Sequence, residues 1–347
     1  MYVLGRGIDL MLSILSNAFG PSGCEDEVRE IIKKEMESLC DEMYVDNIGN
    51  LICHRKGDKV NNKSIMLTAH MDEVGFIISY VTNEGYLKFK TIGGIDPNVL
   101  ISKKIVIGEN RIKGVIGTKP IHQNKSSDDK LKISDLYIDI GAKNKDDALK
   151  YVDLGDYACF DSRCVEFGDG FIKGKALDDR VGCYALINIA KRKPKADIYY
   201  VFAVQEEVGH RGVIVATLNI NPAFAIVLEG TTCSDVPGTD EFGFSTHIGH
   251  GAALSIRDGG AFSDVKLTQE IIKIAKENDI KCQYKQTTMG GNDASAIQIT
   301  ENGIKVAAVS VPCRYIHSQS NVAKLCDIQS MEEIIYTFIE SKVNSND

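Results

Sequence analysis

Seven residues of this 347-residue chain have side chains suited to metal or acid–base chemistry and stand at the ends of predicted elements. They are His70, Asp72, Asp178, Glu206, Glu207, Glu229 and His317. All but Asp178 follow or end an apolar, strand-like run, and Asp178 precedes an apolar run with helical spacing. Because chemistry in open α/β sheets gathers at the carboxyl ends of the strands, we expect these side chains to converge on one edge of one sheet.

So many carboxylates can gather in one place only if a cation compensates their repulsion and the cost of burying them. Mixed imidazole and carboxylate ligands favour zinc, with cobalt or manganese as substitutes. The ligands are more than one catalytic zinc needs, so we expect two divalent ions per subunit, about 3.5 to 4 Å apart, that activate a water for hydrolysis.

The ligands divide between two ions if Asp178 bridges them. His70 and Glu229 would complete one ion, and Glu207 and His317 would complete the other. Asp235, six residues after Glu229, is the alternative to it.

Two further carboxylates are expected to orient a ligand or to transfer a proton. Asp72 would accept the second ring N–H of His70 and fix its tautomer. Glu206, on the opposite side of the strand from Glu207, would be the general base and later the acid for a leaving amine. Helix capping is the alternative role for Asp178 and Asp179, because aspartates are common at the N-cap position of helices.

The order of predicted elements indicates how these residues are positioned. A helix is expected over 9–18, and a capping box at Ser22 and Glu25 predicts a second helix of about 18 residues. Short strands around 47–50, a fully buried strand from 64, and alternating strands and helices after 164 predict a mixed, mostly parallel sheet flanked by helices. Residues 76–163, rich in glycine and β-branched residues, predict a small inserted all-β domain. The larger domain then comprises 1–75 and 164–347.

Composition narrows the class of protein. A net charge of −8 with both signs interspersed argues against nucleic-acid and anionic-membrane binding. The sequence contains no apolar run near the roughly 20 residues that span a bilayer and no signal-peptide pattern, so a cytoplasmic location is expected. The ten cysteines form no C-x-x-C pair, which predicts free, mostly buried thiols.

Four segments in order, HMDEVGF, GKALDDRVG, VQEEVGHRG and RYIHS, resemble the M42 aminopeptidases, some of which are named glutamyl aminopeptidases or cellulases. The segments AFGPSGCEDEVR and GGNDASAIQ also fit that family, so the resemblance covers nearly the whole chain. It implies two metal ions held by His70, Asp178, Glu207, Glu229 and His317, with Glu206 catalytic. Typical members have Asp where this chain has Glu229.

The resemblance also implies peptide substrates and homo-oligomers, in which the inserted domain joins dimers that assemble into tetrahedral dodecamers. The alternative to the dodecamer is a simple dimer in which the β-domain has no role in assembly. Deacylation of N-acyl amino acids or amides, and a catalytically silent scaffold, are the competing functions. Gly290 and Gly291 predict either a substrate-side loop or a tight turn. His122 either reaches a neighbouring site or faces solvent; His210, His247 and His250 receive no role.

Overall fold

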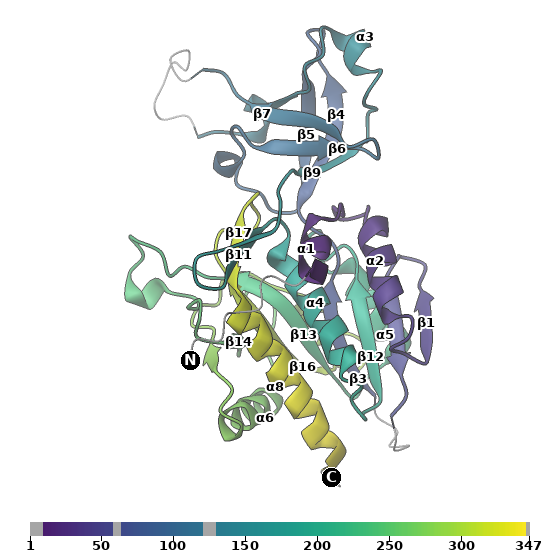
Figure 1. Ribbon diagram of the computed structural model, residues 1–347, viewed down its shortest axis with the longest axis vertical. Coiled ribbons are helices and arrows are strands. Elements are labelled where there is room, and N and C mark those ends of the chain that lie inside the picture. The colour runs from purple at the N-terminus through teal and green to yellow at the C-terminus, as the bar shows by residue number, and fades with distance from the viewer. Residues whose placement is uncertain (1–9, 58–63, 121–129, 345–347) are drawn as a thin grey trace.

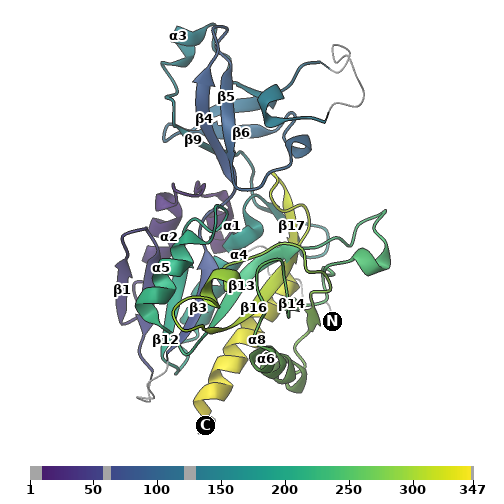
Figure 2. The same ribbon diagram turned by 180° about the vertical axis from the view of Figure 1, so that it is seen from behind.

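The computed structural model describes residues 10–57, 64–120 and 130–344, in two domains (Figures 1 and 2). An eight-stranded mixed sheet forms the centre of the larger one. Its strands, in spatial order, are β1 (Glu42–Val45), β2 (Leu51–Arg55), β12 (Ile198–Ala203), β3 (Ile65–His70), β13 (Phe224–Thr232), β16 (Lys305–Cys313), β14 (Ala252–Ser255) and β15 (Cys282–Tyr284). The central strands β12, β3, β13 and β16 run parallel, so their carboxyl ends share one edge.

Both faces of the sheet are covered by helices, as the apolar central strands require. Every residue of β3 is buried, and successive residues serve opposite cores: Leu67 packs with one apolar cluster and Met66 with another. On the Leu67 side lie α1 (Leu10–Asn17), α2 (Asp26–Met36), α4 (Leu177–Lys191), α6 (Val265–Glu277) and α8 (Leu325–Asn344). On the Met66 side lie α5 (Arg211–Ile220) and α7 (Ala294–Ile297). The predicted fold class is therefore confirmed.

The smaller domain is a closed β-barrel that stands at one end of the molecule (Figure 1). Its strands, in order around the barrel, are β4 (Gly75–Val81), β5 (Leu87–Ile92), β8 (Tyr137–Asp139), β7 (Ile112–Gly117), β6 (Lys104–Ile107) and β9 (Tyr157–Phe160). It has its own apolar core, in which the Phe76 ring meets Phe89 and Phe160 edge to face. The short helix α3 (Lys145–Ala148) precedes β9.

A third, three-stranded sheet was not predicted. It consists of β10 (Val165–Phe167), β11 (Phe171–Gly174) and β17 (Asn321–Lys324), and it joins the segment after the barrel to the segment after β16. Single 3₁₀ turns occur at Pro97–Val99, Ile133–Asp135 and Glu241–Gly243. Among the described residues, no helix combines the length and apolar character needed to cross a membrane.

The predicted capping box at the start of the second helix is wrong. Glu25 is the N-cap of α2 but makes no side-chain cap, and α2 has eleven residues rather than about 18. The Ser22 hydroxyl instead donates to Asp72 at 2.6 Å, and Glu25 accepts from the backbone N–H of Gln205 at 3.2 Å. Both side chains are therefore used by distant segments. The helix expected near Asp293 is also short, a single turn at α7.

Candidate metal centre

The sheet brings the predicted strand-end residues to one edge. His70 is the last residue of β3 and lies opposite Ala203 of β12, so Glu206 and Glu207 follow at the same edge. Strand β13 continues to Thr232, so Glu229 lies within this strand rather than at its end. In the parallel pairing of β13 with β3, Val227 lies opposite Thr68. Two residues further along both strands, Glu229 therefore lies level with His70. His317 follows β16 in a turn with φ of 59°.

The two aspartates at the start of α4 have different roles. The peptide bond between Asp178 and Asp179 is cis, and neither residue has helical backbone angles. Asp179 caps the helix by accepting from the Gly182 N–H at 2.9 Å, and its other oxygen accepts from the His70 N–H at 3.2 Å. Asp178 is left to face both histidines. The capping role expected for aspartate at this position is thus taken by Asp179.

Asp178 lies between the two imidazoles. Its Oδ1 is 3.5 Å from His70 Nε2, and its Oδ2 is 3.6 Å from His317 Nε2. His317 Nε2 is also 3.3 Å from Glu207 Oε2. The side chains of Asp178, Glu207 and His317 can direct one ligand atom each to a common ion, and those of His70, Glu206 and Glu207 form a second such group.

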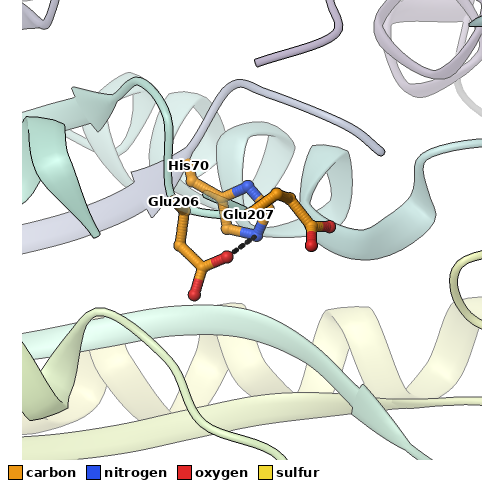
Figure 3. A group of neighbouring side chains, drawn as sticks. All are labelled: His70, Glu206 and Glu207. Carbon is orange, nitrogen blue, oxygen red and sulfur yellow. Dashed lines mark ion pairs between the residues drawn. The ribbon is translucent and has the colours of Figure 1, made fainter. Parts of the chain in front are cut away.

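Glu206 and Glu207 are neighbours in sequence, but their carboxylates diverge around the His70 ring (Figure 3). Glu206 Oε2 lies 3.9 Å from His70 Nε2, the contact drawn as a dashed line. Its Oε1 lies 3.0 Å from His210 Nε2. Glu206 is therefore held beside the ligand cluster while Glu207 turns toward His317.

Glu229, and not Asp235, interacts electrostatically with this cluster, although neither group of side chains that can hold an ion includes Glu229. Glu229 is buried, one of its carboxylate oxygens has no hydrogen-bond partner among the described residues, and it interacts electrostatically with Glu206 and Asp178. Asp235 accepts from the guanidinium of Arg314 at 2.6 Å and from the Ile248 N–H at 3.1 Å. Its charge is already compensated, so the structure does not favour Asp235 as a ligand.

Burial and mutual repulsion perturb the ionisation of this cluster. Burial, followed by the charges of Glu206 and Asp178, raises the pKa of Glu229 well above its ordinary value. Burial also raises the pKa of Glu207 to about 7, although His317 opposes the shift. Burial alone would lower the pKa of His317, but Asp178 and Glu207 outweigh it and raise this pKa to about 11.

These residues fit a pair of divalent cations. Imidazole nitrogens and carboxylate oxygens are the ligand atoms that zinc, cobalt and manganese accept. Asp178 Oδ1 and Glu229 Oε2 are buried without a hydrogen-bond partner among the described residues, which is costly unless something else binds them. An ion adjacent to these oxygens would satisfy both.

Asp72 contacts the His70 ring and the backbone of the two glutamates. Its carboxylate lies 3.3 Å from His70 Nδ1, and the Asp72 carbonyl lies 3.2 Å from the same nitrogen. The carboxylate also accepts from the backbone N–H groups of Glu206 at 3.0 Å and Glu207 at 3.1 Å. Asp72 is fully buried, so it fixes both the ring of His70 and the turn that carries the two glutamates.

Comparison with known proteins shows the family to which this chain belongs. The profile of the M42 glutamyl aminopeptidases matches residues 49–334, which contain every residue of the cluster. The chain belongs to the M42 family.

Individual M42 proteins align over nearly their whole length. A putative aminopeptidase from Acetivibrio thermocellus is 36% identical over 94% of this chain and 96% of its own. An aminopeptidase structure from the archaeon Desulfurococcus kamchatkensis has a TM-score of 0.91 at 34% identity, covering 95% of this chain and 93% of that one. The TET1 peptidase of Pyrococcus horikoshii, which can assemble into a tetrahedron or a large octahedral shell, has a TM-score of 0.84 at 32% identity, covering 95% and 98%.

Two residues near the M42 site had no predicted role. His210 contacts Glu206 and, through Nδ1, lies 3.4 Å from Ser295 Oγ. Asp293 is buried and interacts electrostatically with Glu206, His70 and His210. The spacing of His210, four residues after Glu206, was the only sequence signal for it. Asp293 lies in the GGNDASAIQ segment, next to the glycines predicted to form a substrate-side loop, but its own side chain was given no role.

The remaining predicted residues lie apart from the ligands or outside the described chain. Gly290 and Gly291 are in the loop that leads to Asp293, and the Gly290 carbonyl accepts from the Gly259 N–H at 2.7 Å. Their role in substrate binding stays a prediction. His122 lies outside the described residues. His247 and His250 stack on each other with ring centroids 5.1 Å apart. All ten cysteines are free.

Proposed function

We propose that this chain is a metal-dependent aminopeptidase that removes N-terminal residues from peptides. The observation that carries the proposal is the convergence of His70, His317 and the buried, incompletely paired carboxylates of Asp178 and Glu229 at the carboxyl edge of the sheet. Membership of the M42 family supports the peptidase reaction. The cluster supports metal dependence because Asp178 Oδ1 and Glu229 Oε2 are buried without a hydrogen-bond partner among the described residues.

Five side chains would hold two divalent ions. Asp178 would serve both, His70 and Glu229 one, and Glu207 and His317 the other. The ions, when bound, lower the pKa of a water and polarise the scissile carbonyl. Glutamate at 229 supplies the same oxygen ligand as aspartate through a longer arm.

Glu206 would move the proton in this reaction. Its carboxylate accepts a proton from the attacking water and gives it to the departing amine as the peptide bond breaks. His210 holds one Glu206 oxygen at 3.0 Å, which leaves the other directed to the His70 side of the site. Asp72 fixes the backbone of Glu206 and the tautomer of His70, so neither reorganises during the reaction.

We further propose that the chain forms homo-oligomers through its inserted barrel, with dimers assembling into a dodecamer. A relative of 32% identity and nearly full coverage forms closed shells. Analytical ultracentrifugation of the purified protein tests this: a mass twelve times that of the chain supports the dodecamer, and a stable dimer contradicts it.

The decisive test of function is a kinetic screen on metal-stripped protein reloaded with zinc, cobalt or manganese. Aminoacyl chromogenic substrates and their N-acetylated counterparts would be compared, with a range of N-terminal side chains. We expect hydrolysis only after reloading and only with free N-termini. Full activity after exhaustive chelation would contradict metal dependence, and preference for the acetylated compounds would indicate a deacylase.

A further inference from the structure

Asp293 is a buried acid whose carboxylate has no hydrogen-bond partner within the described part of the chain. It is 1% exposed, and neither carboxylate oxygen has a hydrogen-bond partner among the described residues. It precedes α7 as the N-cap, where aspartate usually accepts from the helix N–H groups. Here the backbone angles, φ −53° and ψ −24°, are helical, and the side chain makes no cap. The usual reason for aspartate at this position is therefore missing.

Among the described residues, the other buried aspartates that are not proposed ligands have hydrogen-bond partners. Asp258, which is 3% exposed, accepts from the N–H groups of Gly260 at 2.8 Å and Ala261 at 2.6 Å. Asp327 accepts from the N–H groups of Gly249 at 2.7 Å and Gly251 at 2.8 Å. Leaving a buried carboxylate unpaired is costly, so a partner supplied from outside the chain is the expected explanation for Asp293.

The surroundings of Asp293 place it beside the metal centre. Its strongest electrostatic neighbours are Glu206, His70 and His210. The next turn also reaches the site, since Ser295 Oγ lies 3.4 Å from the His210 ring. Asp293 is absent from both groups of side chains that can hold an ion. Its carboxylate thus lies near the reacting groups without belonging to the ligands.

The missing partner is expected to be a cation. Burial, and then the charge of Glu206, raises the pKa of Asp293 to about 8, so its negative form is disfavoured until positive charge arrives. An aminopeptidase substrate carries one positive charge that every substrate shares, the ammonium group of its N-terminal residue. This group is compact, donates hydrogen bonds, and lies two bonds from the carbonyl that is attacked.

We propose that Asp293 accepts the α-ammonium group of the substrate and so selects peptides with a free N-terminus. The proposal rests on the aminopeptidase function above. A bound peptide with a blocked N-terminus would leave the buried Asp293 carboxylate without a partner. Enzymes whose buried polar groups hydrogen-bond to one group of the substrate reject analogues that lack this group. Asp293 is therefore a substrate-binding residue, distinct from the proton transfer assigned to Glu206.

The test compares two ligands that differ only in the amine. Leucinamide and 4-methylpentanamide, its analogue without the α-amino group, would be titrated by calorimetry into the metal-loaded, full-length oligomer, and the separately measured heat of leucinamide hydrolysis would be subtracted. Wild-type protein should prefer leucinamide. In Asp293→Asn we expect leucinamide to bind roughly ten- to a hundredfold more weakly, as for loss of a hydrogen bond to a charged group, with 4-methylpentanamide unchanged.

Asp327→Asn is the matched control, because it makes the same change at a buried aspartate remote from the ligands. It should keep the wild-type preference for leucinamide. Metal content would be measured for every variant. Equal weakening of both amides in Asp293→Asn, or loss of bound metal, would overturn the assignment. Asp293→Ser, measured in the same way, decides the question if the Asn variant does not fold.

The substrate screen separates this inference from the proposed function. If wild-type protein hydrolyses free N-terminal substrates and Asp293→Asn keeps the preference for leucinamide, only the role of Asp293 fails. If wild-type protein hydrolyses none of them, the aminopeptidase function fails. A wild type that binds the two amides equally overturns the role of Asp293 in either case.

Discussion

Glu206 differs from Glu207 in what its carboxylate contacts, although the two are adjacent in sequence. Glu207 turns toward His317, whereas Glu206 is held by His210 at 3.0 Å. This division separates the proposed ligand Glu207 from the proposed proton carrier Glu206. It follows from the turn after β12, whose two N–H groups are both fixed by Asp72.

Substituting Glu206→Gln should remove the proton carrier and leave the proposed ligand set intact. We expect kcat on a chromogenic substrate to fall by roughly 10²- to 10⁴-fold, the usual contribution of a general base. Metal content, measured by elemental analysis, should equal that of wild type. Glu277→Gln, an exposed residue of α6, is the matched control and should retain wild-type kcat. Undiminished turnover in Glu206→Gln would contradict the role of this carboxylate.

Glu25 provides a pH-dependent prediction. Burial, and then the charge of Asp72, raises the pKa of Glu25 from 4.5 to about 7. An acid whose pKa is higher in the folded state favours folding fully below the unfolded pKa, and this contribution is lost as pH rises through about 7. By linkage the loss is at most about 3 kcal/mol.

In Glu25→Gln this pH-dependent loss should be absent, while the amide oxygen can still accept from the Gln205 N–H. The melting temperature of the variant relative to wild type should therefore rise between pH 5 and pH 8. Calorimetric melting of metal-free protein at one-unit pH steps measures the difference. A difference that stays constant with pH would show that Glu25 does not titrate in this range.

At the scale of elements, the entry to α4 is joined to α1 and β3 by buried charges. Arg180 is fully buried and donates to the carbonyls of Met71 and Leu15, and its guanidinium pairs with Glu73 at 3.5 Å. Lys175, also buried, pairs with the same Glu73. This network fixes the helix whose first residues include Asp178.

Arg180→Met should lower the free energy of unfolding by about 3 kcal/mol or more, because removing one partner leaves buried charge and carbonyls unpaired. Arg192→Met is the matched control. Arg192 forms a more exposed pair with Glu333, so its loss should cost at most about 1 kcal/mol. Urea unfolding followed by circular dichroism compares the two. Equal shifts in the two variants would contradict the importance of the buried network.

Sequence patterns predicted the elements that are determined by the residues within them. The period of apolar residues predicted β3, β12, β13 and β16, and strand ends predicted which side chains would meet at the edge. The capping box failed because Ser22 and Glu25 bond to Asp72 and Gln205, which are distant in sequence. His210 and Asp293 were missed for the same reason, since their relation to Glu206 exists only after the chain has folded.

At the scale of the whole molecule, the two domains meet at His317, one of the proposed ligands. After β5 of the barrel, the Gly94 carbonyl lies 2.7 Å from His317 Nδ1. This contact fixes the ring orientation that directs Nε2 to Asp178 and Glu207. The barrel segment therefore orients a side chain of the site.

Metal removal should loosen this junction. We expect amide hydrogen exchange at residues 93–95 to become faster in metal-stripped protein, because a His317 ring that is not also held through Nε2 restrains the Gly94 segment less. Exchange in the hairpin between β4 and β5, at the far side of the barrel, should stay unchanged and serves as the internal control. Mass spectrometry of the two forms measures both regions, and a uniform change across the barrel would contradict this coupling.

The order of the ligands along the chain has a consequence for biosynthesis. His70 is made early, Asp178, Glu207 and Glu229 follow the entire barrel, and His317 comes after β16. On a ribosome the nascent chain thus carries an incomplete set of ligands until the last parallel strand has emerged. Under the proposed function, ion loading would then come late, and a partly synthesised chain would lack a complete peptide-cutting centre.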